Sequence, residues 1–217
     1  MIVILTSNLG HYYELDNTKI SKEVDNTNHL VDHIKKYISK YKGILFIPSS
    51  SNTNITNMYA NILFDSLKLS GITFDNYYIL DDYDKLDEYI NNSSLIFLSG
   101  GNTYEQHLLF EKIKLKELLN NYDELIIGQS AGSMNLAKNV FNSDVNSQIY
   151  FEGLGLTDIN VEPHFDIDNI DELVIKESFN RVIYGLPDIS HILITGDSIE
   201  MYGDVYTVKN GIVKKYK

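Results

Sequence analysis

Short apolar runs alternate with longer amphipathic segments along most of the chain. Runs rich in Ile, Leu and Phe predict five buried strands, at residues 2–5, 43–47, 73–79, 95–98 and 125–127. Apolar residues at helical spacing predict four helices between them, at 22–41, 54–69, 85–91 and 104–120. This alternation is typical of βαβ units, so we expect an α/β fold: a three-layer αβα sandwich around a mainly parallel sheet.

The pattern changes beyond about residue 185, where short strands alternate with turns. The predicted strands lie at 192–195, 199–202, 205–208 and 212–216. Asn210-Gly211 is a strong signal for a hairpin between the last two. We expect these C-terminal hairpin strands to extend the sheet edge in antiparallel fashion. With 217 residues and no linker, the chain predicts a single domain over 1–217.

The sequence around Ser130 is the clearest chemical signal. Gly-Gln-Ser-Ala-Gly-Ser at 128–133 follows a predicted strand and precedes a helix-like run. Strand, sharp turn, serine and helix form the layout of a nucleophile elbow. Small residues at 128, 131 and 132 leave room for the strained turn, and the Ala131 amide at the helix start can hold an oxyanion.

A serine nucleophile needs a base, and His164 is the best-placed histidine. It follows Val-Glu-Pro at the end of a strand predicted at 158–161. Ligands of parallel sheets bind beyond the carboxyl ends of the strands. Ser-Gly-Gly-Asn-Thr at 99–103 also follows a strand, and its glycines let the backbone approach a ligand closely. The segment 48–51 follows another strand.

The remaining histidines carry weaker signals. His29 and His33 lie four residues apart on a predicted helix, but no third ligand accompanies them, which favours a polar helix face over a metal site. His11 lies in an N-terminal loop, and His107 lies on the helix after the glycine pair. His191 begins a strand, at the opposite end of the sheet from the elbow.

Composition limits the partners. The net charge of −12 disfavours nucleic acid, and the absence of cysteine excludes disulfides and thiolate chemistry. No apolar run approaches the ~18 residues that span a bilayer, and the N-terminus resembles a buried strand more than a signal peptide. We therefore expect a cytoplasmic protein with no membrane or nucleic-acid partner. The only arginine is Arg181.

Three motifs together resemble the peptidase E family: Ser-Gly-Gly-Asn-Thr at 99–103, Gly-Gln-Ser-Ala-Gly-Ser at 128–133 and Glu-Pro-His-Phe at 162–165. That family comprises α-aspartyl dipeptidases and cyanophycinases. The resemblance implies a class I glutamine amidotransferase-like (flavodoxin-like) fold. It also implies a serine exopeptidase that hydrolyses small peptides, such as Asp-X dipeptides, through an acyl-enzyme. No metal or organic cofactor is expected, and the chain is expected to be a monomer or homodimer.

The resemblance assigns the site residue by residue. Ser130 is the nucleophile, His164 the base, and Gly101 and Ala131 the oxyanion amides, while Gly100, Asn102 and Arg181 are candidates for binding substrate. The acid of the triad is expected to be Asp197, with Asp144 and Glu200 as alternatives. In the helix after His164, where such enzymes carry more than one arginine, this chain has Arg181 alone as a partner for an anionic side chain.

Two other functions share these motifs. An α/β-hydrolase esterase would use Ser130, Asp166 or Asp168, and His191 as its triad. A non-catalytic small-molecule binder would use Ser130 only as a turn residue. The contact of the Ser130 hydroxyl distinguishes them: His164 for the peptidase, His191 for the esterase, and neither for the binder.

Overall fold

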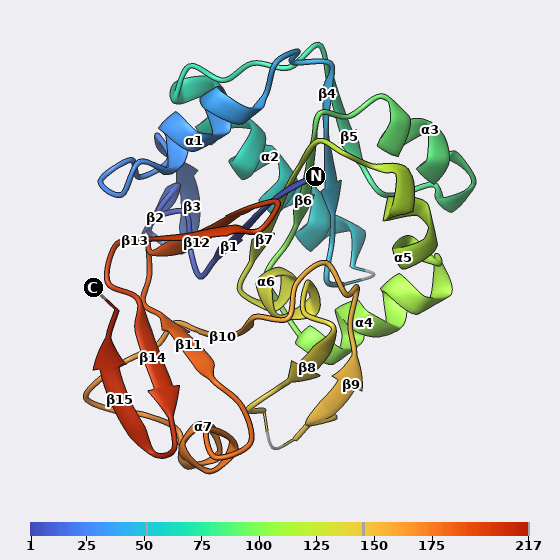
Figure 1. Cartoon of the computed structure of the whole chain (residues 1–217). Helices are drawn as coiled ribbons and strands as arrows, with labels where there is room; N and C mark the ends of the chain where they lie inside the picture. Colours follow the sequence, from blue (N-terminus) through green and yellow to red (C-terminus); the bar gives the residue numbers. More distant parts are fainter. Residues whose placement is uncertain (51, 145, 217) are drawn as a thin grey trace.

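A seven-stranded sheet forms the centre of the computed structural model, which describes residues 1–50, 52–144 and 146–216 (Figure 1). Five parallel strands lie in the order β1 (Ile2–Thr6), β7 (Leu125–Gln129), β6 (Leu95–Leu98), β4 (Gly43–Ile47) and β5 (Asn76–Ile79). At the β1 edge, β12 (His191–Thr195) and β13 (Ser198–Tyr202) continue the sheet in antiparallel fashion.

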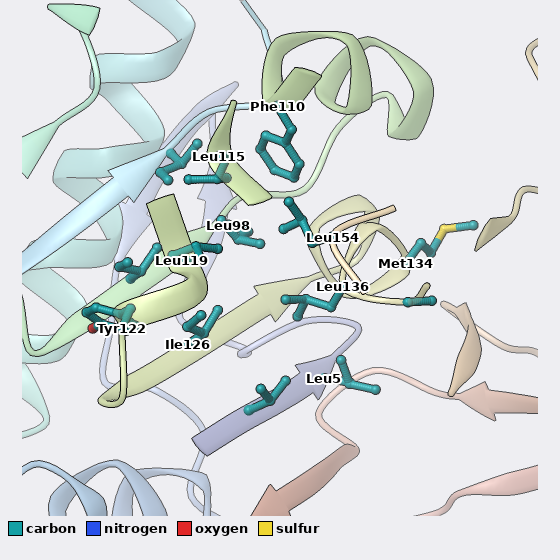
Figure 2. Packing of buried hydrophobic residues seen from close by; sticks show 14 of the residues in the cluster. Leu5, Leu98, Phe110, Leu115, Leu119, Tyr122, Ile126, Met134, Leu136 and Leu154 are labelled. Carbon is teal, nitrogen blue, oxygen red and sulfur yellow. The ribbon is translucent and has the colours of Figure 1, made fainter. Parts of the chain in front are cut away.

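Helices cover both faces of this sheet, because strand residues alternate between the faces. One face packs against α1 (Leu30–Tyr37) and α2 (Thr53–Leu69). The other packs against α3 (Leu86–Asn91), α4 (Thr103–Lys112), α5 (Leu115–Leu118) and α6 (Ala131–Asn135), with short 3-10 turns at Tyr83–Lys85 and Leu119–Asn121. Figure 2 shows Leu5 and Leu98 of the sheet on the second face, with Phe110, Leu115 and Met134 from the helices. The expected three-layer αβα fold is confirmed.

A second sheet has four strands, all from the C-terminal part of the chain. Its strands follow the order β10 (Asn160–Pro163), β11 (Ile183–Leu186), β14 (Tyr206–Lys209) and β15 (Ile212–Lys215), and α7 (Glu172–Glu177) packs against it. β10 and β11 run parallel, with Pro163 opposite Leu186. Both strands therefore end at the same edge, toward the seven-stranded sheet (Figure 1).

The expectation that all four C-terminal strands extend the main sheet is wrong for the last two. β12 and β13 do extend it, but β14 pairs with β11 of the second sheet. The chain turns away from the main sheet at Gly203, whose φ of +80° lies in the region that favours glycine. The Asn210-Gly211 hairpin joins β14 to β15 as predicted.

The structure also contains two hairpins that the pattern did not predict. β2 (Tyr12–Leu15) pairs with β3 (Thr18–Ser21), and β8 (Asn139–Phe141) pairs with β9 (Tyr150–Glu152). α1 is shorter than the helix predicted at 22–41. It begins only after His29, whose φ of 65° is left-handed. In the described ranges, no helix is long and apolar enough to cross a membrane.

Candidate active site

Ser130 lies in a strained turn between β7 and α6. Its φ is 50° and its ψ is −113°, a conformation that a non-glycine residue rarely adopts. The turn is bonded to the end of β1, because the Ser130 N–H donates to the carbonyl of Thr6 over 2.8 Å. The strain is therefore balanced by contacts to β1, and the hydroxyl faces the space beyond the strand ends.

Two glycines and a buried serine let this turn form. A Cβ on Gly132 would lie 2.2 Å from the Leu98 carbonyl oxygen, and one on Gly128 would lie 2.6 Å from the Ser133 nitrogen. The Ser133 hydroxyl accepts the Thr6 N–H over 2.8 Å and lies 2.6 Å from the Gly128 carbonyl oxygen. The small residues expected at this turn are thus required by close backbone approach.

His164 contacts Ser130 directly. Its Nε2 lies 3.1 Å from Ser130 Oγ, within hydrogen-bond reach. His164 has a positive φ of 54°, and its N–H donates to Ser7 Oγ over 2.7 Å. The Ser7 hydroxyl in turn donates to the Leu186 carbonyl. Ser7 therefore joins the end of β1 to the ends of β10 and β11.

Asp188 completes the arrangement. Its Oδ1 lies 2.7 Å from His164 Nδ1, and Asn8 Nδ2 donates to its other oxygen over 3.4 Å. A carboxylate only accepts, so Nδ1 carries the proton and Nε2 is free to accept the proton of Ser130. About half of the His164 and Asp188 side-chain surfaces is exposed (52% and 55%), so substrate can reach the group from solvent.

The expected acid residues lie elsewhere. Asp197 lies in the turn between β12 and β13, the Glu200 carboxylate accepts from Tyr202, and Asp144 accepts the backbone N–H of Asn146. Among the described residues, none of these three carboxylates bonds to His164. Asp188 was missed because it follows β11, a strand that the apolar pattern did not reveal; Pro187 before it parallels Pro163 before His164 and was an unused signal.

The glycine pair after β6 lies beside Ser130. A Cβ on Gly100 would lie 3.4 Å from the Cβ of Ser130, and Gly101 has a φ of +140°. The Ser49 hydroxyl donates to the Gly100 carbonyl over 2.6 Å. Carbonyl and amide of a trans peptide point in opposite directions, so this bond turns the Gly101 N–H away from Ser49.

Ala131 supplies a second free amide at the elbow. It is the first residue of α6, where an N–H has no acceptor within the helix. Its side chain is buried, at 1% exposure, so the backbone position is fixed by packing. Gly101 and Ala131 thus offer two backbone donors near the Ser130 hydroxyl.

A cavity of about 350 Å³ opens at these residues. Ser130, His164, Gly100, Gly101 and Asn102 all line it, which brings together most of the site expected from the sequence. The Asn102 side chain accepts the N–H of Glu105 and so caps α4. A volume near the lower end of the range for ligand sites suits a small substrate.

Arg181 lies outside this cavity, contrary to the expectation that it binds substrate. Its Nε pairs with the buried Glu177 carboxylate at 2.6 Å, and Nη1 donates to the Asn139 carbonyl over 3.0 Å. It lines a separate hollow of about 590 Å³, formed with Tyr150 of β9 and neighbouring residues. The single arginine therefore supports the β8–β9 region.

Among the described residues, no hydrogen bond joins His191 to Ser130. The expectation that His191 lies at the opposite end of the sheet is wrong, because β12 runs antiparallel to β1 and places His191 opposite Thr6, beside the elbow. The His191 ring is fully buried, and its Nε2 lies 3.1 Å from Nδ1 of His33, which shows that His33 is not on a solvated face. The esterase arrangement with His191 is therefore wrong. His11, expected in a loop, is likewise buried (3% exposed) and lines the cavity. Burial lowers its pKa to about 4, so the ring is neutral.

Comparisons with known proteins concern the family and the fold of the chain. A family model, peptidase family S51, matches residues 17–202. The fold is similar to that of a peptidase from an acI-B1 Actinobacterium (TM-score 0.70, 16% identity, covering 99% of this chain and 93% of that one). It is also similar to a candidate peptidase E from Listeria monocytogenes EGD-e (TM-score 0.64, 18% identity, 100% and 98% covered). No curated protein matches the sequence significantly.

Proposed function

The chain belongs to peptidase family S51, and from this premise we propose that it is a serine exopeptidase that cleaves short peptides with Ser130, His164 and Asp188. The single observation that carries the proposal is the chain of contacts Ser130 Oγ–His164 Nε2 (3.1 Å) and His164 Nδ1–Asp188 Oδ1 (2.7 Å). Nucleophile, base and orienting carboxylate are thus within bonding distance of one another.

The proposed reaction has two stages. The Ser130 oxygen attacks the scissile carbonyl while His164 Nε2 takes its proton, and the Gly101 and Ala131 amides stabilise the oxyanion. The imidazolium then gives its proton to the leaving amine, and the C–N bond breaks to leave an acyl-enzyme. Water, deprotonated by His164, hydrolyses the ester and restores Ser130.

Hydrolysis of a dipeptide library by wild-type protein and Ser130→Ala tests the proposal. We expect cleavage by wild type and its loss in Ser130→Ala, with a mass increase on Ser130 after treatment with a fluorophosphonate. Ser50→Ala is the matched control, because Ser50 lines the same cavity without contacting His164. Turnover retained in Ser130→Ala overturns the assignment of Ser130 as nucleophile. No cleavage and no labelling in wild type overturns the mechanism and favours a non-catalytic binder.

A further inference from the structure

The cavity beside Ser130 extends mainly in one direction along the sheet. Ser130 follows β7, which lies between β1 and β6. His164 is on the β1 side, where it bonds to Ser7. Most of the other lining residues lie on the β6 and β4 side or on α2, and Asn8, His11 and Tyr12 line the cavity from the segment after β1. Because His164 gives its proton to the leaving amine, the acyl residue of a substrate lies on the opposite side, in this part of the cavity.

Large apolar groups form much of the wall of this part, with Ser49, Ser50, Thr56 and Ser99 between them as uncharged polar groups. The rings and aliphatic groups come from the hairpin, two strands and one helix face: Tyr12, Phe46, Ile55, Tyr59, Leu63 and Phe97. Ile55, Tyr59 and Leu63 are spaced by four residues on α2, so they face the cavity together. Phe46 and Phe97 stack with ring centroids 5.7 Å apart and form a rigid base.

The charges near this wall do not suit an anionic side chain. No lysine or arginine is among the described residues that line the cavity, and the one carboxylate there belongs to Glu105. Lys19 lies over the Tyr12 ring at 4.8 Å, but its ammonium pairs with Glu14. His11 is held neutral by burial, with its Nδ1 buried and unpartnered among the described residues.

From these contacts we propose that the cavity is the subsite for the acyl residue, and that it selects an uncharged, apolar side chain over a carboxylate. The inference rests on the proposed role of Ser130, which makes the adjoining space the acyl site. It separates this chain from the aspartyl specificity that the resemblance implies. An aspartate placed here would lose its hydration and meet Glu105 without a compensating cation.

Binding to Ser130→Ala tests the subsite separately from turnover. Leu-Leu, Asn-Leu and Asp-Leu share the same branching at the γ position, so they compare polarity and charge at nearly constant size. We expect Leu-Leu to bind at least tenfold more tightly than Asp-Leu, with Asn-Leu between them, when dissociation constants are measured by calorimetry. Turnover of the same peptides by wild type reports separately on the proposed function.

A charge placed at the cavity mouth provides the second measurement. Ile55 is 47% exposed and lines the cavity, whereas Met58 is 40% exposed on the same helix and does not. In the Ser130→Ala background, Ile55→Arg should raise the affinity for Asp-Leu relative to that for Leu-Leu about tenfold. Met58→Arg should leave this affinity ratio unchanged. Equal or tighter binding of Asp-Leu by the parent, or the same response to both arginines, overturns the inference.

Discussion

Asp188 fixes both the direction and the protonation of the His164 ring. The carboxylate accepts from Nδ1 at 2.7 Å, and Asn8 contacts its second oxygen. With about half of both side chains exposed, solvent competes for this bond, so its effect is orientation more than stability. The bond therefore leaves Nε2, the ring nitrogen that faces Ser130, with a free lone pair.

Asp188→Asn should therefore lower kcat about 10³-fold, because the amide can donate to Nδ1 and favour the wrong tautomer. Steady-state hydrolysis of any dipeptide that wild type cleaves measures this. Asp197→Asn is the matched control, since Asp197 lies in the β12–β13 turn, and should keep full activity. Similar rates in both variants would contradict the assignment of the acid.

The Ser49 hydroxyl acts on the proposed oxyanion site through the Gly100 carbonyl, 2.6 Å away. Without it, the Gly100–Gly101 peptide can rotate and misalign the Gly101 amide. Because an oxyanion donor contributes 10²–10³-fold, Ser49→Ala should lower kcat about tenfold and leave KM nearly unchanged. Ser50→Ala, measured in parallel, should keep its kcat; an equal fall would indicate a general disturbance of the loop.

The site residues differ in how far local sequence reveals them. Ser130, His164 and Gly101 lie in motifs a few residues long, in which spacing predicts the local conformation. Asp188 depends on the register of two parallel strands, Pro163 opposite Leu186, and no local pattern encodes that pairing. Arg181 was misplaced for the same reason, because its ion pair with Glu177 is a tertiary contact.

At the scale of elements, the elbow is a close crossing of a strand and a helix. Gly132→Ala would place a methyl group 2.2 Å from the Leu98 carbonyl oxygen, so α6 would have to shift from β6. We expect a loss of about 3 kcal/mol or more in the free energy of unfolding. Urea unfolding followed by circular dichroism measures it.

Gly196→Ala is the control for backbone conformation alone. Gly196 has a φ of +58° and no described atom within 4 Å of an added Cβ. Its substitution should cost about 1 kcal/mol, the usual penalty for a left-handed residue. Comparable losses in the two variants would show that strain, and not the crossing, limits the elbow.

The degree of burial separates the strands that the sequence predicted from those it did not. β4 and β6 match their predicted bounds, because strands buried on both faces are continuous apolar runs. β2 and β3 have four residues each, none of them fully buried, and Asp16 and Asn17 in the turn are both at positive φ. This hairpin packs against α2, and no alternation of apolar residues in its own sequence predicts that contact.

At the scale of the whole molecule, the buried His33–His191 pair couples stability to pH. Burial lowers the pKa of His191 to about 3, from an ordinary value near 6.5. As the pH falls from about 6.5 to 3, the unfolded chain binds a proton that the folded chain does not. The contribution of His191 to the free energy of unfolding should therefore fall over this window, by up to about 1.4 kcal/mol per pH unit, and be constant above it.

His191→Phe removes this titration and keeps an aromatic ring stacked on Tyr202. Its unfolding free energy, measured between pH 4 and 7, should depend less steeply on pH than that of wild type. His29→Gln is the control, because the His29 side chain is 66% exposed. An unchanged slope in His191→Phe would assign the acid sensitivity to other groups.

The proposed nucleophile and its proposed base belong to different sheets. Ser130 follows β7 of the large sheet, whereas His164 and Asp188 follow β10 and β11 of the small one, and Ser7 bridges the two. Turnover should therefore be sensitive to displacements between the two sheets that are too small to expose the core they share. In dilute urea, catalysis should therefore disappear before circular dichroism shows any loss of secondary structure.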